Sequence, residues 1–268
     1  MIKLIFSDLD GTLLDGNGNI PSHFAEVLAQ VRATGAIFAP ASGRQHAAIY
    51  QQFAPYGRDF LIVAENGAFV AQSGEEVFST TMPERLVKDA LQRAAQIEGA
   101  FPVYCGKRRA YVQSVNPIFV REMRKYYTQY QLVESFEEAK EPCVKVSVCD
   151  AERAHAEKNL KPSFMPLAKE LQIIVASNYW LDIMQPNVNK GAAVTRLQKE
   201  WGIAKEECLA FGDYLNDYEM LSAVGESYAM ENAHPDLKKI AKHIAPKNTE
   251  GGVLQVLQQL LAEGKIGA

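Results

Sequence analysis

The segment KLIFSDLDGTLL, residues 3–14, indicates the fold class of this 268-residue chain. It opens with a short apolar run, and polar residues and Gly11 follow directly. A run of this kind predicts a buried strand of a parallel sheet that ends in a loop. Ligands of open α/β sheets bind outside the carboxyl ends of the strands. We therefore expect the carboxylates of Asp8 and Asp10 to lie at a functional site.

Strand and helix patterns alternate over residues 1–82 and again over residues 186–268. This alternation predicts a Rossmann-like parallel sheet with helices on both faces, which forms the core domain. Its helices are expected over residues 21–34, 43–53, 190–201, 217–224 and 251–263, with one more from residue 235. Its strands are expected over residues 3–6, 36–40, 60–64, 208–211 and 228–230, with a hairpin over residues 69–77.

The middle of the chain, residues 83–185, has a different pattern, in which helices are followed by paired strands. Helices are expected over residues 83–97 and 117–127 and from residue 151. Strands are expected over residues 101–105, 110–115, 143–149 and 180–184 and near residue 173. The fold class is therefore α/β, with the core interrupted in sequence by an α+β cap domain that has an antiparallel sheet.

Composition and charge exclude several classes of partner. Hydrophobic residues make up 47% of the chain and charged residues 22%, as in ordinary globular proteins. The net charge of −4 and the short basic run over residues 107–109 argue against nucleic acid. The four scattered cysteines contain no C-x-x-C pair and predict reduced thiols in place of a disulfide framework. Because no signal-peptide core or membrane-spanning apolar stretch is present, we expect a cytoplasmic protein without a membrane partner.

The first acidic cluster favours chemistry over a plain turn. Paired Asp residues beside a Gly can hold a hard cation through oxygen ligands, and Gly11 lets backbone N–H groups turn towards an anion. The alternative is a solvated Asp/Gly turn after a strand. The full D-x-D-G-T string over residues 8–12 arises by chance at about 1 in 100,000 positions of average composition, which argues against coincidence.

The second cluster, Ser42-Gly43-Arg44, follows the second expected strand. A Ser and a Gly at a helix N-terminus offer a hydroxyl, backbone N–H groups and a favourable dipole for phosphate. The alternative for Ser42 is an ordinary helix N-cap.

Two further elements lie where the chain returns to the core. Lys190, in the string Asn-Lys-Gly, is a candidate phosphate ligand, and its alternative is a solvated surface residue. Asp213, Asn216 and Asp217 follow the next short apolar strand and add two carboxylates and an amide. Asp217 is either a cap of the following helix or an outer-shell metal residue. Jointly, the four clusters supply a nucleophile, an acid/base group, metal ligands and phosphate donors.

These strings resemble the haloacid dehalogenase superfamily, and specifically its Cof-type phosphatases. The resemblance covers the core and is carried by Asp8–Leu14, Ser42–Arg44, Glu65–Ala68, Asn189–Gly191, Gly212–Asp217 and Ala229–Ala233. The middle of the chain has the element order of the family's α/β cap. Within it, Tyr104–Gly106 and Ala110–Val112 resemble the bacterial sugar-phosphatase members.

The resemblance implies a phosphoric monoester hydrolase that depends on Mg²⁺ and acts on small phosphorylated metabolites such as sugar phosphates. In this scheme Asp8 is the nucleophile that forms an aspartyl-phosphate, and Asp10 is the acid/base. The implied metal residues are Asp8, the backbone carbonyl of Asp10, Asp213 and, in the outer shell, Asp217. The implied substrate-binding residues are Ser42, Gly43, Arg44, Lys190 and Asn216.

Two other functions fit the same clusters. A phosphotransferase or phosphomutase on this fold passes phosphate to a second sugar in place of water. A receiver-like signalling module also uses Asp, Ser/Thr and Lys, but the large insertion and the second acidic cluster argue against it. In the cap, Tyr104, Tyr111 and the turn at Lys107 are expected to meet the hydroxyls of the sugar.

Overall fold

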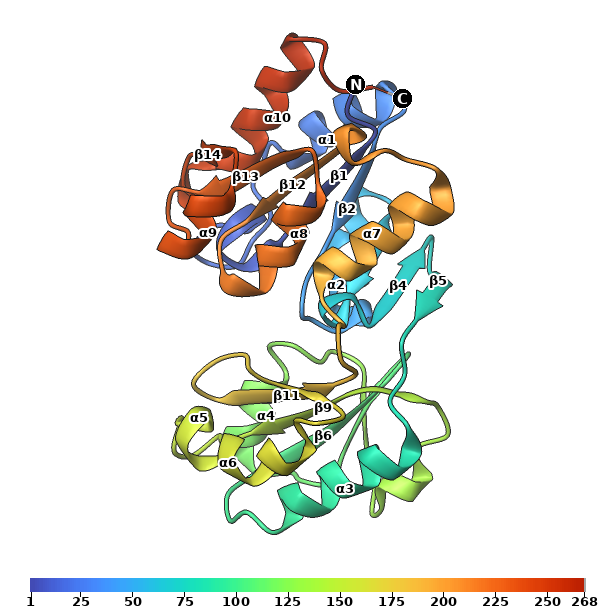
Figure 1. Ribbon diagram of the computed structural model, residues 1–268, viewed down its shortest axis with the longest axis vertical. Helices are drawn as coiled ribbons and strands as arrows, with labels where there is room; N and C mark the ends of the chain where they lie inside the picture. The colour runs from blue at the N-terminus through green and yellow to red at the C-terminus, as the bar shows by residue number, and fades with distance from the viewer. Residues whose placement is uncertain (268) are drawn as a thin grey trace. The chain divides into compact units, whose positions relative to one another are not determined.

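The structure is a computed structural model that describes residues 1–267. Its contacts divide the chain into two compact units, shown in Figure 1. The first, the core unit, comprises Met1–Gly43, Gln52–Val77 and the chain from Asn189 onward, and the second, the inserted unit, comprises Arg44–Gln51 and Phe78–Val188.

Residues 44–51 were expected in the core, but by their contacts they belong to the inserted unit. The side chain of Gln45 explains this assignment, because it pairs with the backbone of Gln129. Its Nε2 donates to the Gln129 carbonyl at 2.9 Å, and its Oε1 accepts from the Gln129 N–H at 3.0 Å.

The core unit is built on a parallel sheet of five strands in the order β14-β13-β12-β1-β2, and each neighbouring pair is parallel. The strands are β1 (Leu4–Ser7), β2 (Ile37–Pro40), β12 (Cys208–Gly212), β13 (Glu226–Met230) and β14 (His243–Ala245). All four residues of β1 are buried, as its apolar run predicts. The predicted parallel core is therefore confirmed, with β14 as an additional edge strand.

Helices lie on both faces of this sheet (Figure 1). They are α1 (Phe24–Ala33), α7 (Lys190–Trp201), α8 (Tyr218–Ala223), α9 (Pro235–Ile240) and α10 (Gly252–Ala262). The connections β1–α1–β2 and β12–α8–β13 run in opposite directions along the sheet. Since such crossovers are right-handed, they place α1 and α8 on opposite faces. The pair α1 and α10 pack together, as do α7 and α8.

A second, three-stranded sheet adjoins β2 through a parallel bridge between Ala41 and Val63. It consists of β3 (Leu61–Ala64), β4 (Phe69–Gln72) and β5 (Glu75–Ser79), in that order. The turn between β4 and β5 uses positive φ angles at Ser73 and Gly74, which confirms the expected hairpin.

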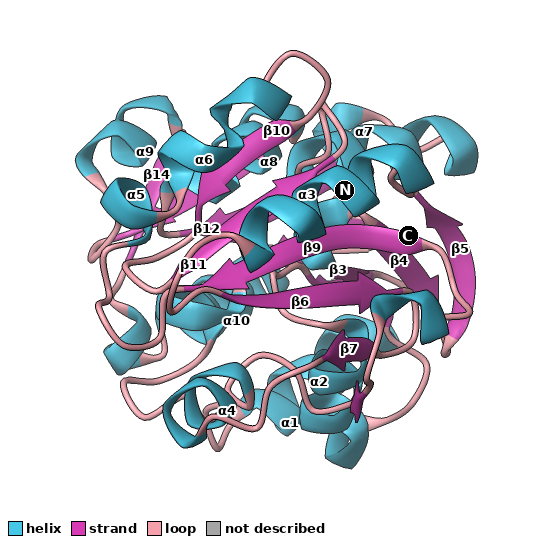
Figure 2. Cartoon of the chain, turned by 90° about the horizontal axis from the view of Figure 1, so that it is seen from below, coloured by secondary structure: helices cyan, strands magenta, loops and turns pink. Residues whose placement is uncertain are grey.

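The inserted unit contains a six-stranded sheet in the order β10-β11-β9-β6-β7-β8, antiparallel except for the pair β7–β8. Its strands are β6 (Phe101–Gly106), β7 (Ala110–Val112), β8 (Tyr130–Leu132), β9 (Cys143–Cys149), β10 (Gln172–Val175) and β11 (Trp180–Met184). Its helices are α2 (His46–Phe53), which runs two residues past the unit, α3 (Glu84–Ala95), α4 (Pro117–Met123), α5 (Ala156–Asn159) and α6 (Lys161–Phe164). Figure 2 shows α3, α5 and α6 in front of the strands, and their apolar side chains share one core with β9 and β11.

The helix expected from residue 151 begins only at Ala156. The preceding turn is fixed by the Asp150 carboxylate, whose Oδ2 accepts from the His155 N–H at 3.1 Å and from Asn159 Nδ2 at 2.7 Å. These bonds give the backbone an alternative to the helical pattern.

Close packing of α7 on α8 gives a test of the core. A Cβ at Gly191 would lie 2.3 Å from backbone atoms of Glu219 in α8. We expect Gly191→Ala to destabilise the protein by about 1–3 kcal/mol, because the helices must separate. The urea midpoint measures this loss. Gly16→Ala is the control, since its Cβ would meet Thr249 at an ordinary 3.5 Å. Equal midpoints for the two variants would contradict the packing argument.

Candidate active site

The candidate site lies at the carboxyl edge of the parallel sheet of the core unit. Asp8 follows β1 and Asp213 follows β12, and these two strands are neighbours. The Asp8 N–H donates to the Phe211 carbonyl at 3.0 Å, which extends the ladder by one residue. The backbone therefore fixes the position from which the Asp8 carboxylate leaves the sheet.

Three carboxylates converge at this edge. Oxygens of Asp8, Asp213 and Asp217 lie within 4.8 Å of one another. The hydroxyl of Thr12 donates to Asp213 Oδ1 at 3.0 Å. Gly11 has a φ of +80°, and a Cβ there would lie 2.3 Å from Asp213 Oδ2, so the loop after β1 approaches Asp213 only with Gly at this position.

Lys190 is held between two of these carboxylates. Its Nζ lies 2.5 Å from Asp8 Oδ1 and 2.6 Å from Asp217 Oδ1, and its side chain has no exposed surface. The solvated-surface alternative for Lys190 is therefore wrong. Asn189 begins α7 by accepting the Ala192 N–H on its side chain at 2.7 Å, which places Lys190 in the first turn of the helix.

Asp217 positions other groups of the site. Its Oδ1 accepts from Lys190, and its Oδ2 accepts from the backbone N–H groups of Asp213 and Tyr214 at 3.0 and 3.2 Å. The side chain makes no capping bond to α8, so the cap alternative does not hold for that helix. Because both oxygens have protein partners, the geometry favours a role for Asp217 in fixing Lys190 and the loop after β12.

The predicted phosphate loop lies at the end of β2. The Ser42 N–H donates to the Val63 carbonyl at 2.9 Å, and the Ser42 carbonyl accepts from the Asn66 N–H at 3.0 Å. A Cβ at Gly43 would lie 3.0 Å from the amide group of Asn66, and Asn216 Nδ2 donates to Asn66 Oδ1 at 3.5 Å. The structure thus brings Ser42, Gly43 and Asn216 together around Asn66, whereas Arg44 belongs to the inserted unit by its contacts.

The charges at the acidic cluster are unbalanced, since three carboxylates face one ammonium group. Burial, followed by repulsion from Asp217, raises the pKa of Asp213 to about 6. Burial raises the pKa of Asp8 well above its usual range, although Lys190 opposes the shift. Burial lowers the pKa of Lys190, but attraction to Asp217 and Asp8 outweighs it, so this pKa is raised. A divalent cation with oxygen ligands fits such a cluster, because it offsets the excess negative charge.

Comparison with known proteins identifies the family. Residues 5–257 match the family model of the haloacid dehalogenase-like hydrolases. The chain is a haloacid dehalogenase-like hydrolase.

Relatives and solved structures agree with this assignment. The hydrolase is 30% identical to 5-amino-6-(5-phospho-D-ribitylamino)uracil phosphatase YbjI of Escherichia coli K12, over 97% of its own length and 96% of the relative. It is 26% identical to phosphatase YwpJ of Bacillus subtilis, over 97% of this chain and all of the relative. The crystal structure of SMU.1108c from Streptococcus mutans superposes with a TM-score of 0.85 at 25% identity, covering 98% and 100% of the two chains.

Asp10 differs from the other predicted metal residues of the hydrolase. Its side chain is exposed, and its carboxylate is not one of the three that converge. Its backbone, with φ −74° and ψ 117°, departs from the surrounding helical turn over Leu9–Leu13. The structure therefore separates the Asp10 carboxylate from the buried cluster.

The sequence analysis assigned no role to three asparagines and one threonine whose hydrogen bonds fix the groups of the site. Asn232 Nδ2 donates to the Gly11 carbonyl at 2.8 Å, and Asn248 Nδ2 donates to the Leu14 carbonyl at 2.8 Å. Thr12 and Asn66 bond as described above. The available signals were the string Ala229–Ala233, which contains Asn232, and the Asn-Gly pair at Asn66, whose φ of +53° suits asparagine.

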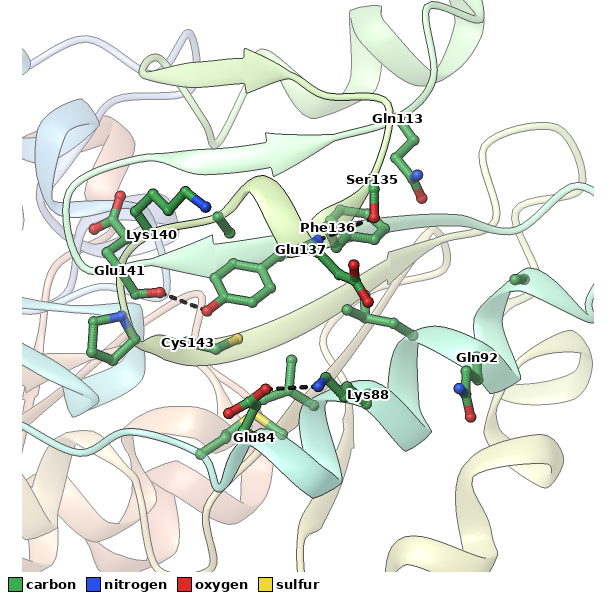
Figure 3. A pocket seen from close by; sticks show the side chains of 17 residues that line it. Glu84, Lys88, Gln92, Gln113, Ser135, Phe136, Glu137, Lys140, Glu141 and Cys143 are labelled. Atoms are coloured by element: carbon green, nitrogen blue, oxygen red, sulfur yellow. Dashed lines mark hydrogen bonds and ion pairs between the residues drawn. The ribbon is translucent and has the colours of Figure 1, made fainter.

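The tyrosines expected to meet a sugar lie elsewhere in the inserted unit of the hydrolase. A cavity of about 810 Å³ there is lined by α3 and by residues 135–143, together with Tyr104 (Figure 3). The Tyr104 hydroxyl donates to the Glu141 carbonyl at 2.6 Å, and the Tyr111 hydroxyl donates to Glu141 Oε1 at 3.0 Å. Each hydroxyl donates its proton within the unit and keeps its acceptor lone pairs, so the contact of Tyr104 and Tyr111 with a sugar stays a prediction. Across residues 1–267, every helix is too short or too polar to traverse a bilayer.

The buried position of Lys190 leads to a stability prediction. Lys190→Met removes the cation between Asp8 and Asp217 and leaves Asp217 buried with an uncompensated charge. We expect a loss of about 3–5 kcal/mol in the free energy of unfolding, measured by urea denaturation. The control is Lys239→Met, whose exposed pair with Asp236 should leave the midpoint unchanged. A Lys190→Met protein as stable as the control would mean that the pair is not needed for folding.

Proposed function

We propose that this hydrolase is a Mg²⁺-dependent phosphatase of small phosphorylated metabolites, with sugar phosphates as its substrate class and the cytoplasm as its location. The observation that supports this most directly is the buried arrangement of Asp8, Lys190 and Asp217 beside Asp213. It offers a nucleophilic carboxylate, a fixed cation and a set of oxygen ligands at the edge where ligands bind. The name of the Escherichia coli relative, a phosphatase of a phospho-ribityl compound, supports the substrate class.

Asp8 is the proposed nucleophile. One carboxylate oxygen forms a bond to phosphorus while the bond from phosphorus to the leaving oxygen breaks, which gives an aspartyl-phosphate and an alcohol. Lys190 lies 2.5 Å from Asp8 Oδ1, so it orients that carboxylate and places positive charge beside the transferring group. Water then attacks the phosphorus and releases phosphate from Asp8.

Asp8, Asp213 and the backbone carbonyl of Asp10 would hold the metal, with Asp217 in the outer shell. When bound, Mg²⁺ offsets the repulsion between the Asp8 carboxylate and the phosphate dianion. Thr12 and Gly11 support this role, because the first orients Asp213 and the second leaves room for it.

Asp10 is the proposed acid/base. Its exposed carboxylate, apart from the buried cluster, protonates the leaving alkoxide and later takes a proton from the attacking water. Ser42, Gly43, Arg44 and Asn216 bind the phosphate oxygens, and residues 83–185 act as a cap that determines which leaving group is accepted.

The first test is a screen of phosphorylated metabolites for phosphate release. We expect turnover with Mg²⁺ present, its loss with EDTA and its return when Mg²⁺ is added back, because a carboxylate and a phosphate dianion repel each other. Each reaction is repeated with a second sugar as acceptor. Transfer to that sugar in preference to water would identify a phosphotransferase, and full activity after metal removal would overturn the metal assignment.

The second test separates Asp8 from Asp10. Asp8→Asn should stop reaction with every substrate, since the nucleophile is lost. Asp10→Asn should retain the first step with p-nitrophenyl phosphate, whose phenolate leaves without protonation, and lose it with sugar phosphates. Water attack then lacks its base, so rapid-quench measurements should show a burst of nitrophenol and accumulated phosphoenzyme. A burst in Asp8→Asn would show that the roles are assigned wrongly.

A further inference from the structure

Two asparagine side chains from the C-terminal part of the core unit bind the loop after β1, which carries Asp10. Asn232 Nδ2 donates to the Gly11 carbonyl at 2.8 Å. Asn248 Nδ2 donates to the Leu14 carbonyl, also at 2.8 Å. The two asparagines are joined as well, because Asn232 Oδ1 accepts from the Asn248 N–H at 3.1 Å. Together they form a clamp on one loop, and we call this pair the asparagine clamp.

The asparagine clamp connects loops that the sheet itself does not join. Asn232 lies in the loop after β13 and Asn248 in the loop after β14, whereas β12 separates both strands from β1. Ladder hydrogen bonds join only neighbouring strands, so here side chains make the connection. The loop after β13 also contacts the loop after β12, since the His234 N–H donates to the Asp213 carbonyl at 2.8 Å. One short segment thus fixes the loop of Asp10 relative to that of Asp213.

The backbone of Asp10 lies between two carbonyl groups that are held by hydrogen bonds. On one side, the Leu9 carbonyl accepts from the Leu14 N–H at 2.9 Å, which closes the turn. On the other side, the Gly11 carbonyl accepts from Asn232. Asp10 and Gly11 are the two residues of this turn whose backbone departs from helical angles. The bond from Asn232 therefore restrains the turn where its backbone is irregular.

Gly11 makes this restraint matter. It has φ +80° and ψ −1°, and without a Cβ its backbone rotates more freely than that of other residues. The bond from the Thr12 hydroxyl to Asp213 lies beyond Gly11, so the rotatable bonds of Gly11 separate it from Asp10. Asn232 acts on Gly11 itself, directly next to Asp10.

A purely stabilising role is the alternative for the asparagine clamp. Asn232 is exposed and Asn248 is half-buried, so water can replace their bonds and each bond adds little to the stability of the fold. General acid catalysis has a stricter requirement, because the acid must lie within hydrogen-bond reach of the leaving oxygen. A displacement of about 1 Å can cost about 100-fold in rate. The clamp therefore suits positioning better than stabilisation.

We propose that Asn232 is a positioning residue for Asp10 and holds its carboxyl group where it protonates the leaving oxygen. In that step the proton passes from the Asp10 carboxyl to the oxygen as the bond from phosphorus to this oxygen breaks, and Asp10 is left as a carboxylate. The proposal rests on the phosphatase function and the acid/base role proposed above. Loss of the Asn232 amide should then affect esters with basic leaving groups most.

The test compares p-nitrophenyl phosphate with phenyl phosphate, two esters of similar shape, of which phenyl phosphate has the more basic leaving group. Rapid-quench measurements give the rate constant for transfer of phosphate to Asp8. We expect Asn232→Ala to slow this step about tenfold with phenyl phosphate and less than about twofold with p-nitrophenyl phosphate, because the first leaving group depends more on the proton. A merely structural role would slow both esters by the same factor.

Two further variants control for the loss of an amide bond. Asn248→Ala removes a bond of the same length to the same loop, but at Leu14, beyond the bond that closes the turn. It should leave the ratio of the two rate constants unchanged. Gln255→Ala removes an exposed bond to the Glu250 carbonyl, 2.7 Å long, elsewhere in the core unit and should change neither rate constant. A change of the ratio in Asn248→Ala as large as in Asn232→Ala would contradict the assignment to Asn232.

A double-mutant cycle shows whether Asn232 acts through Asp10. In the Asp10→Asn background no acid remains to be positioned, so adding Asn232→Ala should change the first step with phenyl phosphate by less than about twofold. An Asp10→Asn protein that slows both esters equally would overturn the acid role itself, so failure of the proposed function is detected in a different variant. Where Asp10→Asn discriminates between the esters, unchanged or equally reduced rates in Asn232→Ala, or a further loss of about tenfold in the double variant, would overturn the proposal.

Discussion

A lysine without exposed surface, held between two carboxylates, is the interaction on which the site depends. Lys190 joins the first turn of α7 to the loop after β1 and, through Asp217, to the loop after β12. The backbones of these segments approach so closely that two nearby positions have no room for a Cβ and require glycine. A Cβ at Gly67 would lie 2.5 Å from the Asn189 carbonyl oxygen, and one at Gly212 would lie 2.5 Å from the Cβ of Asp217. The buried ion pairs and the tight backbone packing are therefore two parts of one constraint.

The fold was predictable from sequence because the core strands are short, apolar and followed by polar loops. The β1 segment is fully buried, and strand–helix alternation gives a parallel sheet by geometry alone. The sequence analysis did not predict strands β8 and β14. Each has three residues and lies at the edge of its sheet, where partial burial gives no clear alternation of apolar and polar residues. At the site, the acidic clusters stood out as strings. The groups that orient them, Thr12 and Asn232, did not, because their partners lie 201 and 221 residues away.

The inserted unit shows that residue type alone does not give the partners of a side chain. The tyrosines near a basic turn predict sugar contacts, and in the structure their hydroxyls donate to Glu141, a partner that the sequence did not indicate. The alternation Val-Lys-Val-Ser-Val in β9 was seen only as a strand, although it separates an apolar face from a charged one. Which face receives the helices is decided by contacts far along the chain, such as those of Phe164 in α6. A single sequence does not reveal that choice.

The pairing of β1 with β12 also constrains how the chain is made. Leu4 aligns with Cys208, and Asp8 meets Lys190 across 182 residues, so β1 has no partner on that side until the ribosome has synthesised β12. The inserted unit from Phe78 to Val188 emerges earlier and makes most of its contacts internally. Domains generally fold as units during synthesis. The inserted unit can therefore fold before the core sheet is complete, although β1 of that sheet is synthesised first. One edge of this apolar strand therefore stays unpaired during the synthesis of about two hundred residues, on the order of ten seconds or more, while β2 is available to the other edge much earlier.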